Sequence, residues 1–214
     1  MVIKDDVEKL IELLKLHKIE YTKDPKDYYY KLRSKHKLID STERTARFIA
    51  LNRTCFNGLY RVNSNGEFNV PIGKYSNPLI CDSINLRNVS VALRYSNVTI
   101  KANDYKQVLL ENAMEGDFIY LDPPYNPESA TSYFTGYTDN GFSNKDQKEL
   151  ADIFKKLDDR KCKVMLTNSS TPLVRELYTP FAKYTKEVES KRAINCKAEK
   201  RQGHTDLIIR NYSR

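Results

Sequence analysis

Glycine is scarce in this chain, and no two of its glycines are separated by a single residue. Only seven of the 214 residues are glycine, and no GxG sequence occurs. A glycine-rich ligand-binding loop of the GxG type is therefore absent from these residues. The four cysteines form no CxxC pair, which leaves a metal site without sequence support and a disulfide framework with little. They are Cys55, Cys81, Cys162 and Cys196.

Long apolar runs are also missing. No stretch approaches the roughly 20 apolar residues that a membrane-spanning helix needs. The first residues, MVIKDDVEKLIELLK, lack the apolar core of a signal peptide. From these absences we expect a cytoplasmic protein that holds no metal and does not contact a membrane.

Positive charge exceeds negative charge. Lysine and arginine number 36 against 28 aspartates and glutamates, which gives a formal charge of +8. Such a balance favours a polyanionic partner, because each neutralised phosphate releases condensed counterions. The 15 tyrosines add aromatic faces that can stack on exposed bases. The simpler interpretation, that most tyrosines line a core or its rim, holds for the majority of them.

The first 90 residues predict a helical lobe followed by a β-hairpin. Apolar residues recur there at helical spacing, and the third helix is expected to bury Ala46, Phe48, Ile49 and Leu51. Apolar and polar residues then alternate around Asn65-Gly66, a strong turn signal for a hairpin. The predicted helices cover residues 5–18, 24–37 and 42–52.

Residues 91–214 predict an α/β unit. Short apolar strands alternate with helices, which indicates a mostly parallel sheet covered on both faces. The predicted strands are 98–100, 118–121 and 164–166, with two antiparallel strands at 185–190 and 206–210. The predicted helices are 83–95, 105–114, 143–160 and 172–178.

The segment with the clearest chemistry is Asp122-Pro123-Pro124-Tyr125, which follows the apolar run FIYL. Ligands of open α/β sheets bind at the carboxyl ends of strands, where the Asp122 carboxylate is expected to emerge. Two prolines make a stiff turn whose carbonyls can accept hydrogen bonds. Acceptors from Asp122 and Pro123 suit the two N–H bonds of adenine N6, and the Tyr125 ring suits an adenine that has left the duplex.

Simpler interpretations exist for the parts of this motif. A double proline alone indicates a rigid loop, and an aspartate at a strand end often caps a helix. An apolar strand that ends directly in DPPY favours the catalytic interpretation instead.

Several motifs in order resemble the Dam-like class of DNA adenine methyltransferases, which includes enzymes acting at GATC. Besides DPPY, Thr167-Asn168-Ser169-Ser170 resembles the motif after the next strand of that class, and Thr205–Tyr212 resembles its closing strand. The segments 51–61 and 66–73 resemble its target-recognition hairpin, and Phe134–Tyr137 resembles the segment that follows DPPY. The resemblance covers nearly the whole chain.

The resemblance implies a fold and a set of roles. The fold would be an α/β, Rossmann-like S-adenosylmethionine-dependent methyltransferase sheet, N-terminally incomplete, with an inserted helical and β-hairpin target-recognition lobe. Asp122, Pro123, Pro124 and Tyr125 would hold a flipped adenine of double-stranded DNA. Asp104, Tyr105 and Asp122 would contact S-adenosylmethionine, although a helix N-cap explains Asp104 nearly as well.

The resemblance also implies which residues read the DNA. Asn57, Leu59, Arg61 and Pro71 match positions that touch the bases of the recognition site, for which GATC is the expected sequence. A guanidinium carried on a hairpin can grip guanine in the major groove, which favours Arg61. An arginine that contacts only phosphate would give affinity without specificity.

One part of the family pattern is missing from these residues. The family places a glycine-rich FxGxG loop before the helical lobe, and the present sequence enters that lobe almost at once. We therefore consider three explanations: a fragment of a longer gene, a separate chain that supplies the segment, or an inactive remnant. The competing functions are a DNA-binding module without catalysis and methylation of an amide or amine in protein or RNA.

Overall fold

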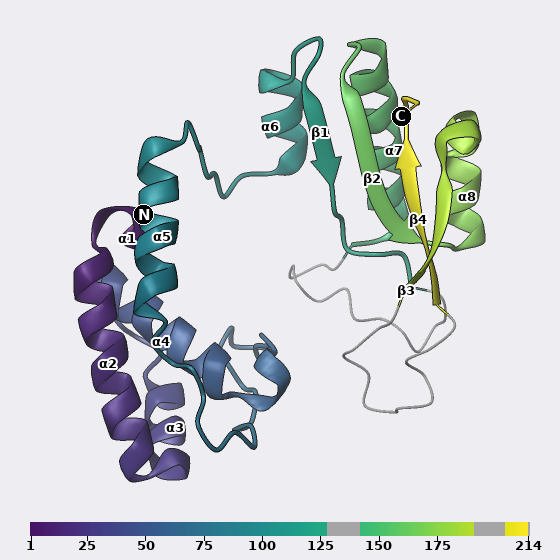
Figure 1. Ribbon diagram of the computed structural model, residues 1–214. Helices are drawn as coiled ribbons and strands as arrows, with labels where there is room; N and C mark the ends of the chain where they lie inside the picture. The colour runs from purple at the N-terminus through teal and green to yellow at the C-terminus, as the bar shows by residue number, and fades with distance from the viewer. Residues whose placement is uncertain (128–141, 191–203, 214) are drawn as a thin grey trace. The chain divides into compact units, whose positions relative to one another are not determined.

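The computed structural model describes residues 1–127, 142–190 and 204–213 (Figure 1). The chain divides into two compact units, Met1–Ile100 and Lys101–Arg214, and each is described by itself. The sequence pattern placed this boundary ten residues earlier, between 90 and 91. The difference arises because helix α5 (Ser83–Tyr95) runs unbroken past residue 90 and packs against α1 (Val2–Asp5).

The first unit is a cluster of helices, and the three helices predicted at its start are confirmed with shifted ends. Asp24 caps α3 by accepting a hydrogen bond from the Asp27 amide at 3.0 Å, and Asp40 caps α4 through the amides of Thr42 and Glu43. The predicted helices correspond to α2 (Val7–Lys23), α3 (Pro25–Ser34) and α4 (Ser41–Thr54).

The core of this unit follows the apolar spacing of the helices, with one correction. Leu10 and Leu14 of α2 and Ala46 of α4 have no exposed surface, and Leu51 is also buried. Phe48, expected to be buried with them, is 49% exposed. Its ring instead lies against Tyr60, with the centroids 5.7 Å apart. Helical spacing alone cannot separate the core face of α4 from its margin.

The predicted hairpin, residues 55–72, runs out and back in antiparallel fashion but has only isolated bridges between its two arms, and we call it the hairpin excursion. The 3₁₀ turn η1 (Phe56–Gly58) opens it, and isolated bridges join Cys55 to Ile72 and Val62 to Phe68. The Gly66 amide donates to the Asn63 carbonyl at 3.0 Å, and Gly66 has a φ of 75°. This geometry is a three-residue hairpin loop, in which glycine takes the left-handed position that other residues avoid.

The second unit contains a four-stranded sheet of order β1-β2-β4-β3. Strands β1 (Phe118–Leu121) and β2 (Lys163–Ser169) are parallel, whereas β4 (His204–Arg210) is antiparallel to both β2 and β3 (Lys186–Ser190). The sheet is therefore mixed, and the expectation of a mostly parallel sheet is wrong for the described residues. Only β1 and β2 need a crossover, which α7 (Asn144–Asp159) belongs to.

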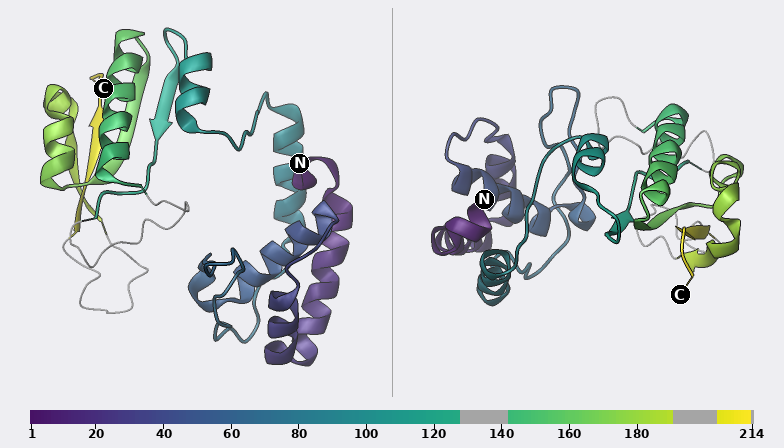
Figure 2. Two further views of the ribbon diagram at one scale, coloured as in Figure 1. Left: turned by 180° about the vertical axis from the view of Figure 1, so that it is seen from behind. Right: turned by 90° about the horizontal axis from the view of Figure 1, so that it is seen from above.

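One face of this sheet is covered. Figures 1 and 2 show α6 (Tyr105–Asn112), α7 and α8 (Pro172–Leu177) on the same side of it. On that side Val164, Leu166 and Ile209 have no exposed surface. On the other side Phe118 and Tyr120 are 58% and 51% exposed. Coverage of both faces, as predicted, is therefore not found among the described residues. The 3₁₀ segment η2 (Thr179–Tyr184) completes the unit.

The short strand predicted at 98–100 is also wrong. Val98 and Ile100 are exposed and have no regular structure. A three-residue apolar segment becomes a strand only when a neighbouring strand pairs with it. No described strand lies beside these residues.

Candidate active site

The Asp122–Tyr125 turn lies at the carboxyl end of β1. The parallel register pairs Leu121 with Leu166, so that Asp122 and Thr167 emerge together at the same edge of the sheet. The Thr167 hydroxyl donates to Asp122 Oδ1 at 3.1 Å and lies 3.1 Å from the Tyr120 hydroxyl. Asp122 itself is exposed. A carboxylate held by a hydroxyl and open on its other side can accept hydrogen bonds from a ligand.

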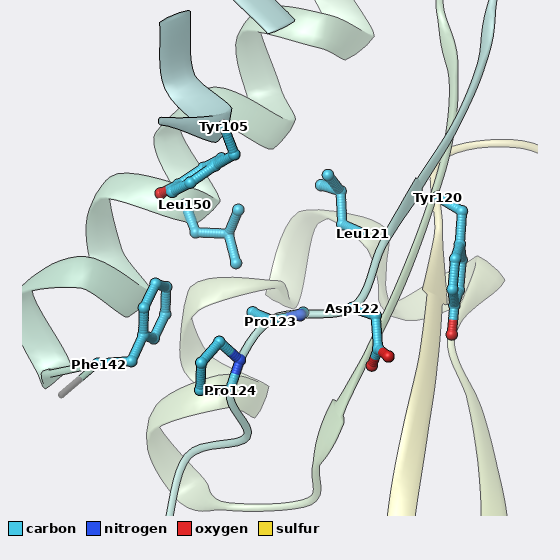
Figure 3. A pocket seen from close by; sticks show the side chains of 8 residues that line it. All are labelled: Tyr105, Tyr120, Leu121, Asp122, Pro123, Pro124, Phe142 and Leu150. Carbon is cyan, nitrogen blue, oxygen red and sulfur yellow. The ribbon is translucent and has the colours of Figure 1, made fainter. Parts of the chain in front are cut away.

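A cavity of about 290 Å³ adjoins this turn, and it lies wholly within the second unit. Figure 3 shows Tyr105, Leu150 and Phe142 on one side, facing Leu121 and the two prolines. The Tyr120 ring and the Asp122 carboxylate project toward the opposite side of the chain (Figure 3). The site thus combines an apolar cavity beside the prolines with a polar edge around Asp122.

Tyr105 is the polar group of the cavity that lacks a partner. Its hydroxyl is buried and makes no hydrogen bond within the described residues. Burial raises the pKa of Tyr105 to about 12, so the hydroxyl is protonated at neutral pH. A buried hydroxyl without a partner costs free energy, and a bound ligand with a polar atom would relieve that cost.

Tyr125 is half-buried. Burial raises the pKa of its hydroxyl, and a hydrogen bond with Thr167 acts in the opposite direction. Thr167 therefore contacts three side chains of the motif strand and turn, Tyr120, Asp122 and Tyr125. One threonine hydroxyl links the polar groups at this edge.

A buried polar network fixes the backbone of the turn from α7 and β2. Gln147 Nε2 donates to the Pro124 carbonyl at 3.0 Å, and Asn168 Nδ2 donates to Gln147 Oε1 at 3.0 Å. Asn168 Oδ1 accepts from the Asn126 amide at 2.9 Å. Gln147 and Asn168 have no exposed surface. Buried amides with both ends bonded hold a unique backbone position, because any shift leaves a polar group unsatisfied.

The far end of the turn is fixed in the same way. Asn126 Oδ1 accepts from the Thr171 hydroxyl at 2.9 Å, and the Asn126 carbonyl accepts from the Ser169 hydroxyl. Thr171 also caps α8 by accepting from the Val174 amide. By contrast, the Pro123 carbonyl accepts no hydrogen bond from any residue that the structure describes. The turn is therefore held at Pro124 and Asn126, and no described residue occupies the Pro123 carbonyl.

Sequence analysis missed Thr167, Gln147 and Asn168 as site residues. The segment that contains Thr167 and Asn168 was noted for its resemblance, and polar residues at the end of an apolar strand are a usable signal. Gln147 gave no signal, because a glutamine in the first turns of a helix is ordinary. The segment Phe134–Tyr137 lies outside the described residues.

Asp104 and Tyr105 lie at the start of α6. The Asp104 carboxylate accepts from the Lys106 amide at 2.8 Å, so it caps the helix, as the simpler interpretation expected. It is exposed and does not line the cavity, whereas Tyr105 does. Of the two residues predicted here for the cofactor, only Tyr105 lines the cavity.

The four residues predicted to read DNA lie together on the hairpin excursion of the first unit. Asn57, Arg61 and Pro71 are exposed, and Leu59 is half-buried. Arg61 Nε donates to Asn69 Oδ1 at 2.7 Å, across the excursion. Asn57 has a φ of 54°, a left-handed conformation that asparagine tolerates.

Comparison with known proteins identifies the family. The model of the D12 class N6 adenine-specific DNA methyltransferases matches residues 1–194. The chain belongs to this class. The type II methyltransferase M.MjaIII of Methanocaldococcus jannaschii is 45% identical, over 99% of this chain and 75% of that protein. The type II methyltransferase M1.LlaDCHI of Lactococcus lactis subsp. cremoris is 43% identical, over 98% and 74%.

A DNA adenine methylase of Escherichia coli (strain K12) is more distant, with 33% identity over 82% of this chain and 66% of that protein. This D12 methyltransferase is thus an adenine-specific DNA methyltransferase by family, and its DPPY turn lies at the cavity described above. Among the residues that the structure describes, no group of three or more histidine, cysteine or acidic side chains is placed to hold a metal ion. No helix in the described parts of the chain is long and apolar enough to cross a membrane.

Proposed function

We propose that this D12 methyltransferase transfers a methyl group from S-adenosylmethionine to adenine N6 in duplex DNA, with GATC as its site. The observation that carries the proposal is the DPPY turn, clamped by Gln147 at the carboxyl end of β1 with the Asp122 carboxylate exposed. The type II names of two relatives support a role in a restriction–modification system.

The turn supplies what a weakly nucleophilic amino group needs. The lone pair of adenine N6 is delocalised into the ring, and acceptors on its two N–H bonds draw the nitrogen toward tetrahedral geometry. The Asp122 carboxylate and the free Pro123 carbonyl are two such acceptors on adjacent residues. The Tyr125 ring stacks on the flipped base, and its hydroxyl is held by Thr167. Positioning by this rigid turn supplies much of the rate.

The cavity beside the prolines suits the adenosyl part of the methyl donor. Its apolar walls match an aromatic ring, and the Tyr105 hydroxyl offers a hydrogen bond that no described residue uses. We propose that Asp104 and Asp122 also contact the methyl donor, Asp122 from the lining of the cavity and Asp104 from outside it. S-adenosylmethionine, when bound, supplies the methyl group on its sulfonium sulfur. Only the chain's own residues then orient the adenine and hold its amino protons.

The exposed hairpin excursion is proposed as the reader of the DNA sequence. Arg61 carries two parallel N–H donors, which match the O6 and N7 acceptors of guanine. Asn57, Leu59 and Pro71 supply the neighbouring contacts. The bond from Arg61 to Asn69 holds the guanidinium across the excursion before DNA arrives.

We further propose that a glycine-rich segment outside these residues completes the donor site, on a separate chain or a longer form of this one. Two observations support it. No GxG occurs in the 214 residues. β1 is an edge strand of the described sheet, so its outer backbone groups have no strand partner there, as in a strand awaiting one.

The test is transfer of labelled methyl from S-adenosylmethionine to duplexes with GATC or a scrambled site. The chain is assayed alone and with a glycine-rich family segment added in trans, in wild-type and Asp122→Ala forms. We expect methylation when the segment is added, of the GATC duplex only, reduced at least about 100-fold in Asp122→Ala. DNA binding without methylation under both conditions would favour the catalytically inactive, sequence-specific DNA binder instead.

A further inference from the structure

The first unit contains a second cavity, of about 230 Å³, whose lining is basic and aromatic. It lies between the end of α3, the face of α4 and the hairpin excursion. Four basic side chains line it, and no aspartate or glutamate does. They are Lys35, His36, Arg44 and Arg47. Nothing proposed for the DPPY site uses this cavity.

The positive charge in this cavity is not neutralised within the unit. Arg47 is half-buried, and its Nε and Nη2 donate to the carbonyls of Leu32 and Arg33 at 3.0 and 2.7 Å. Arg44 Nη1 donates to the Leu38 carbonyl at 3.0 Å. Carbonyl oxygens orient a guanidinium but carry no net charge. Both arginines therefore keep a full positive charge in fixed positions.

Other arginines of the protein are paired differently. Arg87 binds Glu8 through two bonds of 2.7 Å, and Arg175 binds Glu187 at 2.7 Å. No ion pair among the described residues includes Lys35, Arg44 or Arg47. His36 is the exception, because its Nε2 lies 3.9 Å from Glu67 Oε1. Arg47 is half-buried and Lys35 and Arg44 are exposed, and none of the three is paired with a carboxylate of a described residue. Charge that is gathered in one cavity without a counter-charge favours an anion from outside the unit.

Aromatic rings form the remaining wall of the cavity. The Phe48 and Tyr60 centroids are 5.7 Å apart, and those of Tyr60 and Phe68 are 5.8 Å apart. Phe48 and Tyr60 are each 49% exposed, whereas Phe68 is buried. Exposed ring faces beside cations suit a ligand that joins a phosphate to a flat or apolar body, as a nucleotide unit does.

The cavity shares its wall with the proposed DNA reader. Tyr60 directly precedes Arg61, and Phe68 directly precedes Asn69, to which Arg61 is bonded. The excursion therefore carries the aromatic wall of the cavity and the proposed guanine-reading side chain on adjacent residues. A duplex whose bases contact Arg61 would therefore bring its phosphate backbone close to this cavity.

We propose that this cavity binds one backbone phosphate of the DNA, with its deoxyribose against Phe48 and Tyr60. Lys35 and Arg44 at the rim neutralise the phosphate, and Arg47, bonded to the Leu32 and Arg33 carbonyls, forms the base of the cavity. The contact gives affinity and register but reads no base. The proposal takes DNA as the partner from the proposed function, and it adds a specific phosphate site outside the recognition sequence.

The experiment measures the Kd of the full chain for GATC and scrambled duplexes between 50 and 200 mM salt, concentrations over which phosphate contacts are resolved. Lys35→Gln and Arg44→Gln are compared with Lys26→Gln, an exposed lysine of the same unit outside the cavity. Lys35 makes no side-chain bond within the described residues and Arg44 is exposed, so both variants should fold.

Each cavity variant should reduce the magnitude of the slope of log K against log salt, and the two substitutions together should reduce it by about 0.9, equally on both duplexes. The disadvantage of the double variant relative to the wild type should shrink about threefold across that salt range. Lys26→Gln should leave the slope unchanged. Unchanged slopes in Lys35→Gln and Arg44→Gln would overturn the proposal.

Two further readouts separate this proposal from others. If inorganic phosphate raises the thermal midpoint of the wild type while DNA slopes are unaffected, the cavity is a free-anion site and the DNA assignment is wrong. Methyl transfer is measured in parallel at saturating DNA. Slopes that fall as expected in a chain that never methylates would support the phosphate site while the proposed catalytic function fails.

Discussion

Replacing Gln147 with leucine tests whether the buried network positions the DPPY turn. Leucine has a similar volume but cannot bond, so the Pro124 carbonyl and the Asn168 amide would each lose a partner at a site with no exposed surface. Each unsatisfied buried group costs about 1–3 kcal/mol, so the free energy of unfolding should fall by roughly 2–6 kcal/mol. The turn should also lose its fixed position relative to Asp122.

The assay joins urea denaturation with methyl-transfer kinetics at saturating donor and DNA. A displaced turn should lower kcat by as much as about 100-fold. Gln147→Glu separates the two bonds, because its carboxylate still accepts from Asn168 but repels the Pro124 carbonyl. Lowering the pH protonates a buried glutamate, which restores a donor and should recover kcat in that variant.

The matched control is Gln107→Leu on α6, an exposed glutamine that bonds only Glu111 within the helix. It should change neither the urea midpoint nor kcat appreciably. A Gln147→Leu protein with wild-type kcat would refute the positioning argument, even if its stability had fallen. Loss of kcat in Gln147→Glu at neutral pH and its recovery on acidification would attribute the effect to the Pro124 bond, because the Asn168 bond is kept throughout.

Three other predictions concern single side chains. Tyr105→Phe should raise the free energy of unfolding, since it removes a buried hydroxyl that has no partner among the described residues. The same variant should bind S-adenosylmethionine more weakly in calorimetry. Unchanged affinity would exclude the hydroxyl from the donor site. Arg61→Lys should reduce discrimination between GATC and a duplex with its guanine replaced by about 1–3 kcal/mol, measured as a ratio of Kd values. Burial, assisted by Lys35, lowers the pKa of His17 to about 4. Between about pH 6.5 and 4 the His17 imidazole is protonated in the unfolded chain but neutral in the folded one. The free energy of unfolding should therefore fall as the pH drops from about 6.5 to 4. His17→Gln should flatten this part of the denaturation profile, and an identical profile in both proteins would contradict it.

Local signals account for much of what the sequence predicted. The helices α2, α3 and α4 were found because capping aspartates, Pro25 and apolar spacing act within one helix. The DPPY motif was found because two prolines after an apolar strand restrict the backbone whatever surrounds them. Asp122 at the carboxyl end of β1 needed no knowledge of the neighbouring strands.

Pairing and coverage were not predictable in the same way. The strand expected at 98–100 lacks a partner, and the sheet is mixed with one covered face among the described residues. Strand formation depends on a neighbour, and a period-two pattern does not specify which neighbour or which direction. The prediction that Phe48 lies in the core was wrong for a similar reason, because helical spacing does not show where the elements packed against a helix end.

The sequence by itself determined the family motifs, the basic charge and the stiff turn that presents Asp122, since each depends on residues close together in the chain. Only the tertiary structure brought Gln147 to the Pro124 carbonyl, Asn168 to Gln147 and Thr167 to Asp122, across 21 to 45 positions. Among the described residues it also left the Tyr105 hydroxyl without a partner and gathered Lys35, Arg44 and Arg47 without a carboxylate. Hydrogen bonding and charge compensation are decided by which groups meet in space, and local sequence does not encode that.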